Sequence, residues 1–135
     1  MLVSTTKYRV TYADTDTMGV MYYGNYAKLF EIGRTEMIRE NGITYKEIED
    51  AGTMMPVVAM NTKYLRPVKY DELITIESSL KELPTARMVF YHKIFNEEGN
   101  LSTLSEVTLV FLDRKTSRPC RPPEILVDYL KSEGL

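Results

Sequence analysis

The sequence predicts an α+β fold in which an antiparallel sheet wraps around one long central helix. One long stretch, Asn25 to Asn41, has the period of an amphipathic helix, and most of the remaining chain is strand-like. Short connections at 83–86 and 96–100 join the later strand-like stretches, and such connections favour hairpins between antiparallel strands. Because the helix has a single apolar stripe, we expect the sheet to curve around it.

The first strand is predicted at Lys7 to Tyr12. Tyr8, Val10 and Tyr12 alternate there with polar residues, which is typical of a half-buried strand. A loop follows from Ala13 to Gly24 and contains two aspartates and two glycines.

The long helix is predicted from apolar and small residues that recur on one face, namely Tyr26, Leu29, Phe30, Gly33 and Met37. Gly24 and Asn25 can supply its N-cap, and Asn41 with Gly42 predicts its end. Gly33 lowers helix propensity by about 1 kcal/mol, so we expect it to permit a close approach of the helix to the sheet.

The rest of the chain predicts a short helix, four strands and a last helix. Thr44 and Glu47 fit a capping box, and Gly52 is expected to end the short helix. The strands are expected as an antiparallel meander at 56–65, 73–83, 87–95 and 102–112, followed by a helix that begins at Pro122-Pro123-Glu124. An oligomer is expected to cover the sheet edges.

Composition predicts one globular domain over residues 1–135. Hydrophobic residues make up 44% and charged residues 27%, and a chain of 135 residues can bury about two thirds of its surface. No apolar run is long enough for a transmembrane segment, and we find no signal peptide. The single cysteine, Cys120, cannot form an internal disulfide, so we expect a cytoplasmic protein.

Charge and motifs exclude several classes of function. The net charge is −2, which disfavours a nucleic-acid partner. His92 is the only histidine and lies in an alternating strand, so two-histidine metal sites are excluded and we expect a packing or surface role. GxSxG, GxxxxGK[ST] and GxGxxG motifs are absent, and Cys120 would need an activating partner. We expect no metal and no cofactor.

The loop before the long helix holds the remaining chemistry. Asp14 and Asp16 are carboxylates close to the core, and unpaired amides near Tyr23 to Tyr26 can polarise a carbonyl group. A thiolate leaves without a general acid, so a site poor in histidine favours thioesters over amides or oxygen esters. The alternative is that both aspartates are turn or cap residues.

The sequence resembles the 4-hydroxybenzoyl-CoA thioesterase family, which includes the YbgC-type acyl-CoA thioesterases and has the hotdog fold. The resemblance covers nearly the whole chain and is carried by Asp14-Thr15-Asp16, Gly19-Val20, Tyr22-Tyr23-Gly24-Asn25-Tyr26, the helix from Phe30 to Glu36, Pro56-Val57-Val58 and the stretch from Tyr70 to Glu77.

The resemblance implies an acyl-CoA thioesterase. Asp16 would be its catalytic carboxylate, as nucleophile or general base, the Tyr23 amide would polarise the thioester carbonyl, and Asp14 would fix the loop. It also implies a homodimer with joined sheets and the site at the interface, often paired into a homotetramer.

The expected substrate contacts are Gly24, Asn25, Val58 and Met60, with Phe30 beside them in an apolar slot. Two departures from the family pattern affect these expectations. Tyr23 stands where several relatives carry histidine, which leaves a backbone role. A basic cluster of some relatives is also missing, so the CoA phosphates would be met elsewhere, at Arg66, Arg87 or Lys115.

Three alternatives remain open at this point. The protein could bind acyl-CoA or acyl carrier protein without catalysis, could hydrolyse acyl carrier protein thioesters, or could be a hotdog dehydratase. Acyl-chain preference also remains open.

Overall fold

A computed structural model describes residues 1–40 and 42–135. Its main sheet has the order β1-β4-β5-β6-β3, and all neighbouring strands are antiparallel. The strands of this sheet are β1 (Leu2–Arg9), β3 (Val57–Tyr64), β4 (Leu73–Leu80), β5 (Arg87–Phe95) and β6 (Leu101–Val110). A small second sheet pairs β2 (Thr53–Met54) with β7 (Leu112–Asp113), and the helices are α1 (Tyr26–Arg39), α2 (Tyr45–Asp50) and α3 (Glu124–Ser132).

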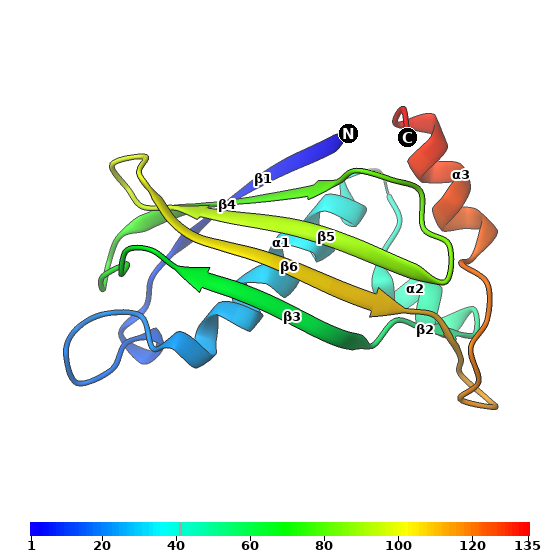
Figure 1. Ribbon diagram of the computed structural model, residues 1–135, viewed down its shortest axis with the longest axis horizontal. Helices are drawn as coiled ribbons and strands as arrows, with labels where there is room; N and C mark the ends of the chain where they lie inside the picture. Colours follow the sequence, from blue (N-terminus) through cyan, green and yellow to red (C-terminus); the bar gives the residue numbers. More distant parts are fainter. Residues whose placement is uncertain (41) are drawn as a thin grey trace.

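Helix α1 lies against one face of the main sheet, as the fold prediction requires (Figure 1). All five residues of its predicted apolar stripe are buried. At Gly33, an added Cβ would overlap the hydroxyl oxygen of Ser78 and lie 2.7 Å from Ile76 Cγ2, both on β4. The expected close approach of helix and sheet at Gly33 is therefore confirmed.

The boundaries of α1 differ from the prediction at its start. Asn25 has helical backbone angles and its side chain caps nothing, because a 3₁₀ turn, Tyr23–Asn25, leads into the helix. The predicted end at Asn41 lies outside the described residues. In α2, the Thr44 hydroxyl accepts the Glu47 amide at 3.0 Å, as the capping pattern predicts.

The predicted strand order is wrong for one strand. Only β4, β5 and β6 form a meander, whereas β3 pairs with β6 at the far edge and β1 takes the place beside β4. The connection between β3 and β4 runs over residues 65–72 and is too long for a tight hairpin, so it carries the chain across to the other side of the sheet.

The first strand also differs from its prediction. β1 begins at Leu2 because it pairs with β4 along its whole length, and it ends at Arg9. Tyr12, expected on the buried face, is exposed because it opens a short 3₁₀ turn, Tyr12–Asp14.

Strand β3 is an edge strand with little cover. Nearly every residue from Val57 to Tyr64 is exposed, including the apolar Val58 and Met60. α3 packs at the end of the fold where β1 begins and α1 ends, with Leu126 and Leu130 buried (Figure 1). Among the described residues, no helix has the length and apolarity needed to cross a membrane.

Candidate active site

The loop between β1 and α1 is fastened to the segment 66–72. The Val10 amide donates to the Glu72 carbonyl, and the Asp71 amide donates back to Val10, both at 2.9 Å. Further along the loop, the Met21 amide donates to the Val68 carbonyl at 2.8 Å. These backbone bonds hold the loop at the N-terminal end of α1.

Asp14 is the buried anchor of this loop, with 2% of its surface exposed. One carboxylate oxygen accepts the Tyr8 hydroxyl at 2.7 Å and both the amide and the hydroxyl of Thr11 at 2.9 Å. The other oxygen accepts the Lys28 ammonium at 2.6 Å. Asp14 therefore joins the end of β1 to the first turns of α1.

The hydrogen bonds to Asp14 keep it ionised. Burial alone would raise the pKa of this carboxyl, but the bonds from Lys28, Thr11 and Tyr8 outweigh burial and lower the pKa to about 2. Both oxygens are occupied, so Asp14 cannot reach a substrate. This arrangement fits the structural role that the resemblance implies for Asp14.

Asp16 lies two residues further along, on a tight hairpin, and its side chain is exposed. The expected position close to the core is therefore correct for Asp14 and wrong for Asp16. Its carbonyl accepts the Gly19 amide at 3.1 Å, and its carboxylate oxygen Oδ1 accepts the Met18 amide at 2.8 Å. Gly19 has φ +76°, which the hairpin requires at that position. The second carboxylate oxygen has no partner within the described part of the chain.

The start of α1 offers amides close to this hairpin. The Tyr22 amide donates to the Asp14 carbonyl and the Asn25 amide donates to Tyr22, both at 2.9 Å. Among residues 1–40 and 42–135, none accepts the amides of Tyr23 or Gly24. An N-terminal helix end with unused amides can polarise a carbonyl group.

A short antiparallel pairing within the loop connects the segment of Asp16 to the segment that leads into Tyr23. Thr15 is bridged to Met21, so the chain from Asp14 to Asp16 runs antiparallel to the chain that leads into Tyr23. The two residues from Asp14 to Asp16 span about 7 Å of extended chain. Asp16 therefore lies opposite Val20, two residues along this pairing from Asp14, which contacts Tyr22 at the helix start.

Aromatic rings connect the loop to β3. The rings of Tyr22 and Tyr23 lie 4.8 Å apart, and Tyr64 on β3 lies 5.2 Å from Tyr26 and 6.5 Å from Tyr23. Tyr64 and Met60 pair with the buried Thr103 and Val107 of β6, so both lie on the side of β3 that faces α1. A bulge between Val57 and Ala59 brings Val57 opposite the buried Leu109, and Val58 is the extra residue of that bulge. These apolar side chains form an exposed strip beside α1.

Comparison with known proteins decides the family. The model of the thioesterase-like superfamily matches residues 10–130. The chain belongs to this superfamily. YneP of Bacillus subtilis is 32% identical over 129 residues, which cover 96% of this chain and 94% of YneP. The acyl-CoA thioester hydrolase YbgC of Escherichia coli is 29% identical over 123 residues, 91% of this chain and 92% of YbgC.

Solved structures agree with the family match. A DHNA-CoA thioesterase from Staphylococcus aureus superposes with a TM-score of 0.90 at 32% identity, over 98% of this chain and 89% of that one. The resemblance, the hotdog fold and the enzyme class, a thioester hydrolase, are thereby confirmed.

The other predicted substrate contacts of this thioesterase lie in three places: on β3, in the core beneath α1, and at the start of α1. Val58 and Met60 lie on the exposed strip of β3, whereas Phe30 is fully buried and stacks on His92, with ring centroids 5.1 Å apart. Gly24 lies at the start of α1, where an added Cβ would meet the Tyr22 ring at 2.5 Å. Asn25 donates its side-chain amide to the Asp14 carbonyl at 2.8 Å and so also fastens the loop.

The predicted phosphate-binding cations do not lie together. Arg66 follows β3 at the end of the sheet near the loop, where its amide donates to the Ser102 carbonyl at 3.1 Å. Arg87 begins β5 opposite Val110, at the other end of the sheet. Both residues are exposed, and one phosphate group cannot contact both within a single chain.

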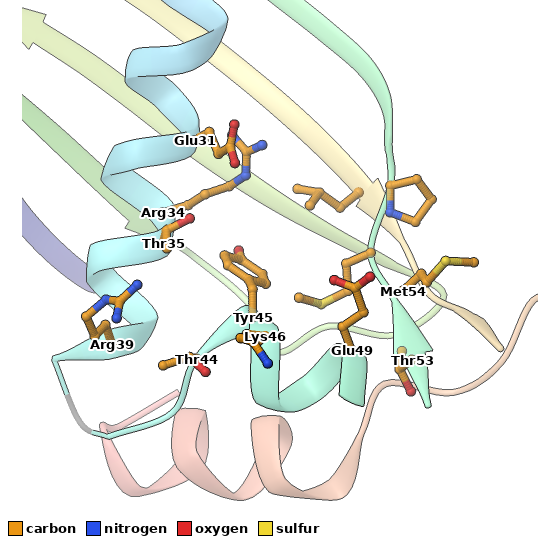
Figure 2. A pocket seen from close by; sticks show the side chains of 13 residues that line it. Glu31, Arg34, Thr35, Arg39, Thr44, Tyr45, Lys46, Glu49, Thr53 and Met54 are labelled. Carbon is orange, nitrogen blue, oxygen red and sulfur yellow. The ribbon is translucent and has the colours of Figure 1, made fainter. Parts of the chain in front are cut away.

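Sequence reasoning missed a cavity of about 610 Å³ beside the second half of α1 (Figure 2). Arg34 of α1 and Tyr45 of α2 reach into it, and Met54 and Met55 line it beside the start of β3. Arg34 is only 8% exposed. The spacing of Phe30, Arg34 and Ile38, each four residues apart, was the available signal, because it places Arg34 on the buried stripe.

Proposed function

We propose that this thioesterase hydrolyses acyl-CoA to a free acid and CoA, with Asp16 as the catalytic carboxylate. The observation that carries the proposal is that Asp16, with a free carboxylate oxygen, shares one braced loop with the unused amides of Tyr23 and Gly24. The Tyr23 amide would bind the thioester carbonyl oxygen as negative charge develops on it, and Asp16 would attack the carbonyl carbon or deprotonate a water molecule.

The surrounding groups support Asp16 as the reacting carboxylate. The oxygens of Asp14 are fully occupied, and His92 is buried beneath α1, where it hydrogen-bonds to Ser78. Expelling a thiolate needs no proton donor at neutral pH, since thiols have pKa values near 8.5. The site therefore suits a thioester without help from histidine, and a histidine-dependent dehydratase reaction is disfavoured.

We also infer that the working enzyme is a dimer in which two sheets join, with two dimers able to pair. The support is strand β3, which has an unpaired backbone edge and exposed apolar side chains at Val58 and Met60. An exposed apolar edge strand pairs readily with another strand. A second copy would cover this strip and form one wall of an acyl slot beside α1.

The catalytic proposal is tested with Asp16→Asn. Turnover should fall by about 10² to 10⁴ because the variant removes the base or nucleophile while keeping the turn geometry. Release of free thiol from short, long and aromatic acyl-CoAs is measured with a chromogenic thiol reagent. Asp128→Asn, which changes an exposed aspartate on α3, serves as the control and should keep full activity.

Unchanged turnover of Asp16→Asn would remove Asp16 from the mechanism. A wild-type protein that binds acyl-CoA, seen as an increase in Tm, but releases no thiol would instead establish a binding protein without catalysis.

A further inference from the structure

The cavity beside α1 contains polar groups that the fold leaves without partners. The Tyr45 hydroxyl is buried beside the Arg34 guanidinium, but its geometry fits no hydrogen bond to any described residue. The described residues also give the Arg34 guanidinium no ion pair, although Glu31 lies one turn earlier on the same helix. A buried polar group without a partner is costly, and binding of a polar ligand is one way to remove that cost.

The other cations of the cavity are already paired. Arg39 forms an ion pair with Glu36 at 3.4 Å, and Lys46 pairs with Asp50 at 3.0 Å. Burial lowers the pKa of the Arg34 guanidinium, but arginine remains charged at neutral pH. Arg34 is therefore the buried positive charge that faces the cavity, and Tyr45 stands beside it, whereas the two carboxylates of the lining, Glu31 and Glu49, are exposed (Figure 2).

The cavity lies at the far end of the exposed strip on β3. This strand runs from Val57, next to the cavity residue Pro56, to Tyr64, which contacts the loop at the start of α1 (Figure 1). At 1.5 Å per residue, Arg34 is about 12 Å along the helix from Tyr26. An acyl group whose carbonyl lies at the start of α1 can thus run along Met60 and Val58 and end beside Arg34.

We propose that this cavity receives the far end of the acyl group and that Arg34 and Tyr45 bind a carboxylate there. The substrate is then an acyl-CoA whose acyl chain ends in a second carboxylate. This inference rests on the proposed function. A guanidinium and a phenol can both donate to one carboxylate, and the apolar Met54, Met55 and Leu109 contact the last methylene groups.

The test compares acyl-CoAs of equal length that end in a carboxylate or a methyl group. Suberoyl-CoA is paired with octanoyl-CoA and sebacoyl-CoA with decanoyl-CoA, and kcat/KM is measured for each. In each pair, the wild-type enzyme should have the higher kcat/KM for the acyl-CoA that ends in a carboxylate. Arg34→Met should reduce that preference about ten- to hundredfold, which is the usual value of a charged hydrogen bond. Arg39→Met, an exposed cation at the same cavity, should change it less than twofold.

Tyr45→Phe is the second variant, because Arg34→Met alters the packing of α1. Losing an unpaired buried hydroxyl should leave Tm unchanged or raised, yet reduce the preference for the carboxylate several-fold. A purely structural role for Tyr45 would leave the preference unchanged.

Binding is measured in parallel by calorimetry with sebacoyl-CoA and decanoyl-CoA. Equal or better use of decanoyl-CoA by the wild type, with no effect of Arg34→Met or Tyr45→Phe, would overturn this inference and leave the thioesterase function intact. Absence of all turnover would contradict the proposed function, and tighter binding of sebacoyl-CoA that depends on Arg34 would still support the cavity assignment.

Discussion

The surroundings of His92, which lies beneath α1, determine whether its imidazole is protonated. His92 lies between the rings of Phe30 and Phe90, with its Nδ1 2.9 Å from the Ser78 hydroxyl. Burial, and secondly the positive charge of Arg34, lowers the pKa of His92 from 6.5 to about 3. The imidazole is therefore neutral in the folded protein at all moderately acidic pH values.

The neutral state of His92 predicts acid sensitivity. Between pH 6.5 and about 3 the unfolded chain binds a proton that the folded chain does not, so stability falls as the pH decreases. The free energy of unfolding should drop by about 2 kcal/mol between pH 7 and pH 5. Urea unfolding at both pH values measures this difference.

His92→Phe is the control for acid sensitivity. Since His92 is the only histidine, no other side chain has an ordinary pKa near 6.5, and the variant should lose most of this pH dependence. Asp14 also makes the protein less stable as the pH decreases, but only below the ordinary aspartate pKa of 3.8. A wild-type free energy that stays flat from pH 7 to pH 5 would contradict the assignment.

The contacts of individual side chains could be predicted from the sequence only in part. The pattern around Asp14 and Asp16 identified the loop. It could not show which carboxylate accepts hydrogen bonds at both oxygens, because Tyr8 and Lys28 reach Asp14 only after folding. Arg34 was overlooked because an arginine on an apolar stripe is normally read as a surface residue. The roles of Asp16, Tyr23, Arg66 and Arg87 stay predictions.

At the scale of elements, α1 was predictable because its stripe is periodic and local. Gly33 even indicated the contact with the sheet. The position of β3 was not predictable, since every strand has a similar alternating pattern and nothing in the sequence identifies its partner. Non-local pairing of this kind is set by the chain path through 65–72 and by α1 filling the space beneath the sheet.

Gly33→Ala tests how tightly α1 and the sheet are packed. Helix propensity alone predicts a gain of about 1 kcal/mol, but the new methyl group would collide with Ser78 and Ile76. We expect a net loss of about 1 to 3 kcal/mol by chemical denaturation. Ala27→Gly, at an exposed position on the same helix, should cost no more than its propensity. An increase in Tm for Gly33→Ala would show that the helix can move off β4.

At the scale of the whole molecule, the exposed edge of β3 predicts self-association. Val58→Lys places a charge on that edge and should shift a dimer toward monomer in sedimentation equilibrium. Ile125→Lys, at a similarly exposed apolar residue on α3, should leave the assembly unchanged. A wild-type protein that is monomeric at micromolar concentration would contradict the joined-sheet dimer.

The hydrogen bonds between the loop and segment 66–72 set when the site can exist during translation. On the ribosome, Asp16, Tyr23 and the whole of α1 emerge before Val68, Asp71 and Glu72 do. A nascent chain that stops before this segment thus carries both proposed catalytic groups without the backbone partners that hold them. Catalytic competence should therefore not arise before this mid-chain segment has been synthesised and has paired with the loop.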